Sequence, residues 1–177
     1  MELVRRHSEM RLVEFVDMKR LTHRATDHWV RERCGIWPLS VSTDRIAYPA
    51  LRAAPLLSGK LRDGSGQVAE VYPAAALLAW GLPNRGYKGP EGRAGRERIV
   101  AGLLDALPGL DGGAFDPESL LCDDNRLDAL VAALVARAVA CGFCEPIPAE
   151  HLGDARVEGW IHVPSEGSLA RLGAAAP

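Results

Sequence analysis

The stretch Gln67-Val68-Ala69-Glu70-Val71-Tyr72 is the best candidate for a β-strand in this sequence, and Pro73 follows it directly. Its β-branched and aromatic residues alternate with small or polar ones, which is the pattern of a half-buried strand. The turn sequence Asp-Gly-Ser-Gly at 63–66 precedes it, and Pro73 stands at the favoured first position of a helix that ends before Gly81. A strand that runs directly into a helix predicts an α/β fold.

Helical patterns flank this strand on both sides. The strongest runs from about Asp123 to Cys141, with apolar residues at helical spacing and Gly142 as its stop. Its apolar positions are Leu127, Leu130, Val131, Leu134, Val135 and Ala138. Shorter helices are predicted from Thr26 and Asp27 to Gly35, from 42–44 to Leu57 with interruptions at Pro49 and Pro55, and from Glu97 to Leu107. A short final strand is predicted at 158–164.

Length and composition favour one globular domain. The chain has 177 residues, 47% of them hydrophobic, which is enough to bury a sizeable core. The formal net charge of -2 provides no overall basic field, so a nucleic-acid partner would have to bind a local patch. We find neither an apolar run of membrane-spanning length nor a signal-peptide core, and we therefore expect a cytoplasmic protein with no membrane partner. Four scattered cysteines are expected to be reduced thiols.

Two carboxylates fall among apolar neighbours. Glu70 shares a strand face with Val68 and Tyr72, near the strand end where α/β sites gather. Asp128 falls inside the apolar stripe of the long helix. A carboxylate in such a place needs a cation, several donors or a metal ion. Mg²⁺ or Mn²⁺ would fit oxygen ligands, and two such ions could activate water for phosphodiester hydrolysis.

A purely structural interpretation stays open beside this one. Glu70 could pair with an arginine, while Asp124 and Asp128 would be stabilised near the positive end of their helix. The basic side chains of the loop at 84–96 are similarly ambiguous, because Glu91 and Glu97 lie among them. Arg85, Lys88, Arg93 and Arg96 would form either a phosphate-binding patch or a solvated loop.

Several segments together resemble one known family. They are Arg24-Ala25-Thr26-Asp27, 38–46 (Pro-Leu-Ser-Val-Ser-Thr-Asp-Arg-Ile), 70–74 (Glu-Val-Tyr-Pro-Ala), Gly86-Tyr87-Lys88, 127–133 (Leu-Asp-Ala-Leu-Val-Ala-Ala) and Glu158-Gly159-Trp160-Ile161. The ordered series, from about Arg20 to Pro164, is similar to the domain of unknown function 429 family, predicted nucleases of the ribonuclease H-like fold. The resemblance implies a partial ribonuclease H-like domain at 24–164, after a weakly defined helical segment at 1–23 and before a frayed tail at 165–177.

The resemblance also implies an activity, namely metal-dependent phosphodiester hydrolysis of nucleic acid. Glu70 matches the middle acid of the family and Asp128 the helix acid, and Asp27 lies in a recurring Arg-x-Thr-Asp element and is a third catalytic candidate. The expected metal ligands for Mg²⁺ or Mn²⁺ are Glu70, Asp128 and Asp124. Arg24 and Lys88 are expected to contact phosphate.

The sequence departs from the family pattern at its start, and this departure has two possible explanations. That pattern opens with a Gly-x-Asp strand, and nothing before Arg24 resembles it. We expect either a true start upstream of Met1, which we favour, or a gene that has decayed to a partial domain. The expected fold is thus ribonuclease H-like without its first strands, with few strands flanked by several helices. The alternatives are a noncatalytic nucleotide- or nucleic-acid-binding module, and a partial domain whose open sheet edge a partner or a second copy completes.

Overall fold

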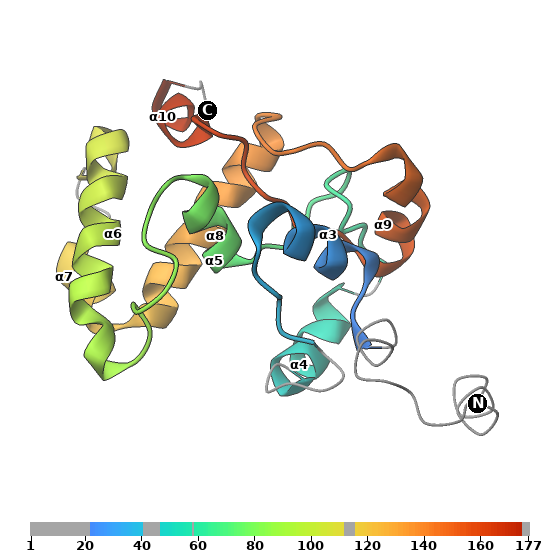
Figure 1. Ribbon diagram of the computed structural model, residues 1–177, viewed down its shortest axis with the longest axis horizontal. Coiled ribbons are helices and arrows are strands. Elements are labelled where there is room, and N and C mark those ends of the chain that lie inside the picture. The colour runs from blue at the N-terminus through green and yellow to red at the C-terminus, as the bar shows by residue number, and fades with distance from the viewer. Residues whose placement is uncertain (1–21, 41–46, 58, 112–115, 175–177) are drawn as a thin grey trace.

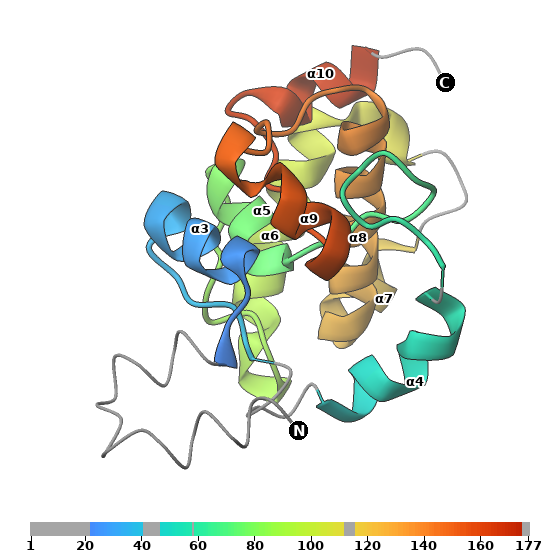
Figure 2. The same ribbon diagram turned by 90° about the vertical axis from the view of Figure 1, so that its right-hand side faces the viewer.

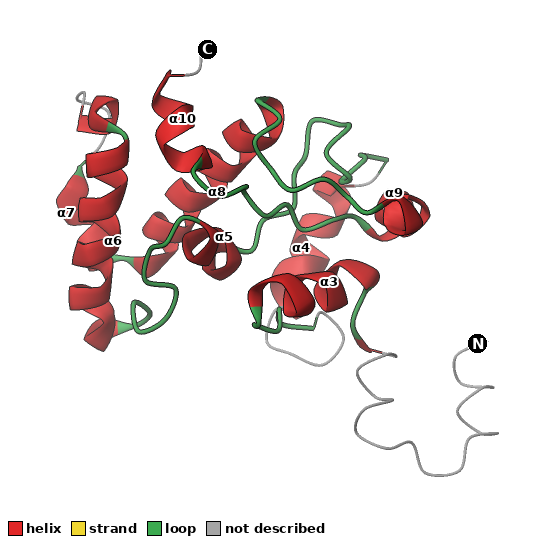
Figure 3. Cartoon of the chain, turned by 45° about the horizontal axis from the view of Figure 1, so that its top comes forward, coloured by secondary structure: helices red, strands yellow, loops and turns green. Residues whose placement is uncertain are grey.

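Helices dominate the computed structural model, which describes residues 22–40, 47–57, 59–111 and 116–174 (Figure 1). The α-helices are α3 (Ala25–Cys34), α4 (Ala47–Leu57), α5 (Pro73–Ala79), α6 (Arg93–Ala106), α7 (Pro117–Cys122), α8 (Asp124–Ala140), α9 (Leu152–Glu158) and α10 (Ser168–Ala174). Three short 3₁₀ helices cover Pro90–Gly92, Pro108–Asp111 and Ala149–His151. Within the described ranges there is no β-strand, only three isolated β-bridges (Figure 3). The predicted α/β, ribonuclease H-like fold is therefore wrong.

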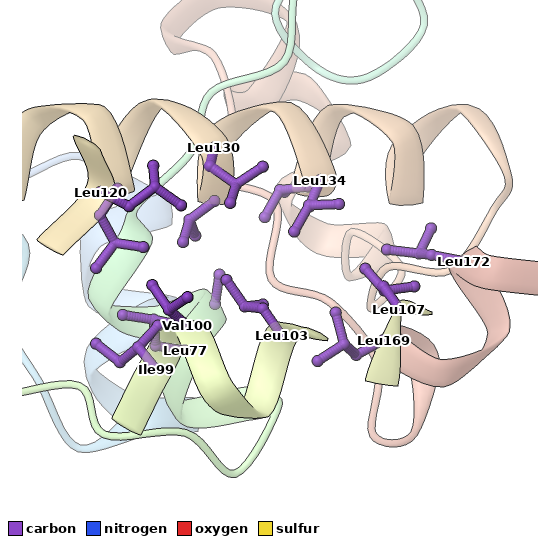
Figure 4. Close-up of a cluster of buried hydrophobic side chains, with 14 of the residues drawn as sticks. Leu77, Ile99, Val100, Leu103, Leu107, Leu120, Leu130, Leu134, Leu169 and Leu172 are labelled. Atoms are coloured by element: carbon purple, nitrogen blue, oxygen red, sulfur yellow. The ribbon is translucent and has the colours of Figure 1, made fainter. Parts of the chain in front are cut away.

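The larger hydrophobic core lies between α5, α6, α7, α8 and α10 (Figure 4). The apolar stripe predicted for the long helix is buried in it throughout, with Leu127, Val131 and Val135 fully inaccessible to solvent. Ile99 and Leu103 of α6 face this stripe from the opposite side. Burying each of these side chains contributes roughly 1.5–3 kcal/mol. The packing of α8 follows directly from the sequence periodicity.

A smaller core joins α3 to the rest of the molecule. Val30 of α3 packs there with Ala75 of α5 and with Ile161 and Val163. Because Ala75 faces this cluster while Leu77 belongs to the larger core, α5 lies between the two. Figures 1 and 2 show α3 and α9 on one side of α5, with α4 at the edge of the molecule.

The segment predicted as the central strand is extended but almost unpaired. Ala69 makes an antiparallel bridge to Asp63, and Glu70 makes a parallel bridge to Ile161, where the His162 amide donates to the Glu70 carbonyl at 3.0 Å. Neither pairing grows into a ladder. Pro73 ends the segment, and Pro164, which lacks an N–H, ends its partner. The predicted final strand at 158–164 is likewise absent, because extended segments need a continuous partner and two-stranded pairings are only marginally stable.

The predicted helices are mostly present, with different ends. The helices ending at Gly35 and Gly142 and the one starting at Pro73 are confirmed, and α6 begins at Arg93 rather than Glu97. The expected interruptions of α4 are wrong, since the helix runs unbroken from Ala47 to Leu57, with Pro49 in its first turn and Pro55 in its interior. Its expected cap at 42–44 lies outside the described residues, as do residues 1–21 of the helical segment expected at 1–23.

Three helices did not follow from the sequence patterns, namely α7, α9 and α10. The tail was expected to fray, yet α10 buries Leu169 and Leu172 in the larger core. Only residues 175–177 of that tail lie outside the description. None of the described helices combines the length and the apolar character of a membrane-spanning segment.

Candidate functional site

One cavity of about 750 Å³ collects most of the residues predicted to carry function. Its walls come from the start of α3, the extended residues 70–72 with the first residues of α5, the loop at 84–88 and the first turns of α8. The predicted site residues that line it are Arg24, Asp27, Glu70, Lys88 and Asp128. Arg24 and Asp128, which are 104 positions apart in the sequence, thus line the same cavity. Asp124 lies 3.6 Å from the ammonium group of Lys88, which also lines it.

Two arginines hold the carboxylate of Glu70. Nη1 of Arg24 donates to Oε2 at 2.7 Å, and Nη1 of Arg62 donates to Oε1. The Glu70 side chain is 17% exposed, so both ion pairs are largely shielded from water. The two guanidinium groups also donate to the carbonyl of Glu158 at 3.0 Å each. Glu70 and its two arginines therefore join the start of α3, the segment 62–70 and the end of α9. The pairing of Glu70 with arginine is the arrangement expected under the structural interpretation.

Asp27 is buried at the first turn of α3, where it caps the helix. Its Oδ2 accepts the backbone N–H of Arg24 at 2.9 Å, and both its oxygens accept weaker bonds from the Arg24 guanidinium at 3.4 Å. Burial lowers the pKa of Arg24, but the charges of Glu70 and Asp27 outweigh this effect, so that pKa is raised above its ordinary value. The hydroxyl oxygen of neighbouring Thr26 accepts a hydrogen bond from the Ile161 amide at 2.8 Å, which holds the first turn of α3 beside the cavity.

Asp128 has both carboxylate oxygens occupied on the opposite wall. The Tyr87 hydroxyl donates to Oδ1 at 3.0 Å, and the Lys88 ammonium contacts Oδ2. Lys88 also lies 3.6 Å from Asp124, one turn earlier on α8, so two carboxylates share one ammonium group. Burial raises the pKa of the Tyr87 phenol, and the negative charge of Asp128 raises it further.

The two acids predicted to act together share a cavity but not a cation. Glu70 belongs to the arginine cluster, and Asp128 belongs to the cluster with Tyr87 and Lys88. Among the described residues, no three His, Cys, Asp or Glu side chains gather closely enough to hold a metal ion. The roles assigned to these acids as metal ligands and catalytic groups stay predictions.

The basic loop divides into three environments. Arg85 and Lys88 line the cavity, as a phosphate-binding patch would require. Arg93 instead forms exposed ion pairs with Glu97 and Glu118. Arg96 is buried beneath the loop.

Sequence reasoning did not identify Arg62 and Tyr87 as site residues. Arg62 could have been found from the glycine-containing turn at 63–66, because a reversal there brings position 62 near position 70. Tyr87 stands inside the Gly-Tyr-Lys element and gave no signal of its own, since its role depends on a helix 41 residues further along.

Comparison with known proteins gives one positive finding. The sequence model of a family described as "Protein of unknown function (DUF429)" matches residues 16–152, more than three quarters of the chain. The protein therefore belongs to the DUF429 family, as its resemblance predicted. Neither the curated proteins nor the solved structures contain a match.

Proposed function

We propose that the cavity binds a phosphate-bearing ligand, which is either a nucleotide or a nucleic-acid strand. The observation that carries this proposal is the gathering of four basic side chains from three segments around one space of about 750 Å³. They are Arg24, Arg62, Arg85 and Lys88. Arginine and lysine are the usual partners of phosphate oxygens, through charge-assisted hydrogen bonds. Three carboxylates line the same cavity and repel an anion. The attraction for phosphate therefore depends on the basic side chains that these carboxylates do not neutralise.

The basic side chains differ in how many of their N–H groups remain available to a ligand. Arg24 already gives four N–H groups to Asp27, Glu70 and Glu158. Arg85 is exposed and makes no hydrogen bond or ion pair with any residue in the described ranges. Lys88 is half exposed and can turn toward a ligand, at the expense of its contact with Asp128. Arg85 is therefore the first phosphate contact, and Lys88 is the second.

Binding of a fluorescein-labelled single-stranded oligothymidylate, followed by anisotropy, tests the proposal. We expect Arg85→Ala to weaken binding about tenfold, because it removes one charge-assisted hydrogen bond to phosphate. Arg98→Ala is the matched control, since Arg98 is another exposed arginine but lies away from the cavity. Binding should also weaken as salt rises. A nucleoside monophosphate serves as a second probe by calorimetry.

The two probes separate the sources of the phosphate group. If only the oligonucleotide binds, the ligand is a strand, and if both bind with similar affinity, one nucleotide is sufficient. If neither probe binds to the wild-type protein, or if Arg85→Ala binds as tightly as Arg98→Ala, the proposal is wrong.

A second candidate function, metal-dependent phosphodiester hydrolysis, is favoured by the arrangement on α8. Asp124 and Asp128 already converge on one cation, the ammonium of Lys88. Mg²⁺ is commonly held by one or two carboxylates together with substrate phosphates, so these two side chains fit such an ion. Glu70 does not fit as a ligand in this arrangement, because both its oxygens accept from arginines. When bound, the ion would polarise a phosphoryl oxygen.

Cleavage of the labelled oligonucleotide with Mg²⁺ or Mn²⁺, against an EDTA control, tests this candidate. Asp128→Asn should abolish cleavage, whereas Asp105→Asn, an exposed position on α6, should leave it unchanged. Cleavage that survives Asp128→Asn would come from a contaminant or another site. No cleavage by the wild-type protein, with binding retained, would leave a binding module.

A further inference from the structure

Arg96 is a buried charge that lies outside the cavity. It belongs to α6, is 4% exposed, and has no carboxylate within ion-pair distance among the described residues. An unpaired buried guanidinium is costly unless hydrogen bonds replace its hydration. Three carbonyls supply those bonds, those of Leu121, Tyr87 and Gly89, each at 2.7 Å.

Two of these carbonyls lie on either side of Lys88. Nη1 of Arg96 donates to the carbonyls of Tyr87 and Gly89, so a single nitrogen holds the backbone before and after that lysine. Nε donates to the carbonyl of Leu121 in α7, which anchors the guanidinium at its other end. The planar, fixed arrangement of arginine donors suits this geometry, whereas an ammonium group would not reproduce it.

Glycines let the loop lie against α6 closely enough for this contact. A Cβ on Gly95 would collide with the backbone of Gly86, and one on Gly92 would collide with the backbone of Tyr87. The Gly89 amide also donates to Asp124 at 3.3 Å, which ties the loop to α8. The segment is thus fixed from two sides, and Tyr87 and Lys88 are presented to Asp128.

We propose that Arg96 is a positioning residue, which sets the contact of Tyr87 and Lys88 with Asp128 and thereby shapes one wall of the cavity. The inference that this affects affinity rests on the proposed binding function. Arg96 does not touch the ligand and acts only through the backbone around Lys88.

The test uses Arg96→Met, which keeps the size but removes the donors, Arg96→Lys, which keeps the charge, and the control Arg93→Met. Arg93 lies one turn earlier on α6 and is exposed. Its substitution by methionine makes the same change in net charge without removing a buried contact. The first readout is hydrogen exchange at the Gly89 amide, which donates to Asp124 in the wild-type protein, compared with exchange at the amides of α8. The second is the affinity for the labelled oligothymidylate.

We expect Arg96→Met to speed exchange at the Gly89 amide but not in α8, and to weaken oligonucleotide binding about tenfold, with Arg96→Lys intermediate and Arg93→Met unchanged. Unchanged exchange at Gly89 in Arg96→Met would overturn the proposal. If the wild-type protein binds no probe, the proposed function fails, but hydrogen exchange still decides whether Arg96 positions the loop. Should Arg96→Met not fold, Arg96→Lys is judged by the same two readouts.

Discussion

The Tyr87 hydroxyl donates a hydrogen bond to Oδ1 of Asp128 at 3.0 Å, and this bond joins the loop before α6 to the first turns of α8. Since Lys88 contacts the other oxygen, a charged carboxylate, a phenol and an ammonium group form one unit. Within this unit, burial and the negative charge of Asp128 raise the pKa of the Tyr87 phenol.

We expect Asp128→Asn to lower the pKa of Tyr87. The negative charge of Asp128 favours the neutral phenol, so its removal favours ionisation, while burial still holds the pKa above its ordinary value. An absorbance titration of the tyrosines measures the shift, with Asp105→Asn as the control. An unchanged titration would mean that Asp128 does not contact Tyr87 in solution.

Glu70→Gln should destabilise the fold by roughly 3 kcal/mol, because it leaves the shielded Arg62 without its counter-charge and Arg24 with Asp27 alone. Chemical denaturation measures the loss. Glu118→Gln, which breaks the exposed pair with Arg93, should have no comparable effect. Equal stability of the two variants would show that the arginine cluster does not hold the three segments together.

Gly159→Ala should be more destabilising than Gly35→Ala. Gly159 has φ 83° and ψ 171°, a region that is essentially restricted to glycine, and a Cβ there would collide with the Glu70 carboxylate. Gly35 has φ 70° and ψ 6° with open space around it, so alanine costs only the left-handed strain of about 1 kcal/mol. Thermal unfolding of both variants measures the difference, which would vanish if residues 158–161 move away from Glu70.

Stability should fall in mild acid because of His162. Its ring is buried, Nε2 has no partner among the described residues, and burial lowers its pKa below the ordinary 6.5. The unfolded chain therefore binds a proton before the folded one does, so the stabilisation is present above pH 6.5 and is lost as pH falls toward the lowered folded pKa. His162→Gln should flatten this dependence in denaturation curves, and His151→Gln should not.

Most of the longer helices could be predicted from the sequence because their signals are local. Leu127 and Leu134 recur with the helical period, and Pro73, Gly35 and Gly142 mark helix ends through their own backbone preferences. The strand at 67–72 was predicted on equally local grounds, but a strand also needs a partner along its length. In the described structure the segment has only two isolated bridges, from Ala69 to Asp63 and from Glu70 to Ile161, and alternation alone could not reveal this.

The two central acids of the candidate site could be chosen from the sequence, but their partners could not. Glu70 and Asp128 were chosen because a carboxylate among apolar residues needs a partner, and both have one. Which partner each takes depends on distant backbone. Arg62 reaches Glu70 because residues 63–66 reverse the chain, and Tyr87 reaches Asp128 because α6 and α8 pack together. The reversal at 63–66 has a local signal in its glycines, whereas the packing that brings Tyr87 to Asp128 has none.

The bonds from Arg24 and Thr26 to Glu158 and Ile161 span 134 and 135 residues along the chain, and this has a consequence for the order of folding. The larger core is built from elements that follow one another between 73 and 174, so it can form before so long a loop closes. We expect amides of α8 to be protected early in refolding, and the contact of Trp29 with Trp160 to form last. Pulsed hydrogen exchange beside tryptophan emission would show the order, and early Trp29 burial would reverse it. A protein built this way completes its cavity only in the final step, when α3 docks.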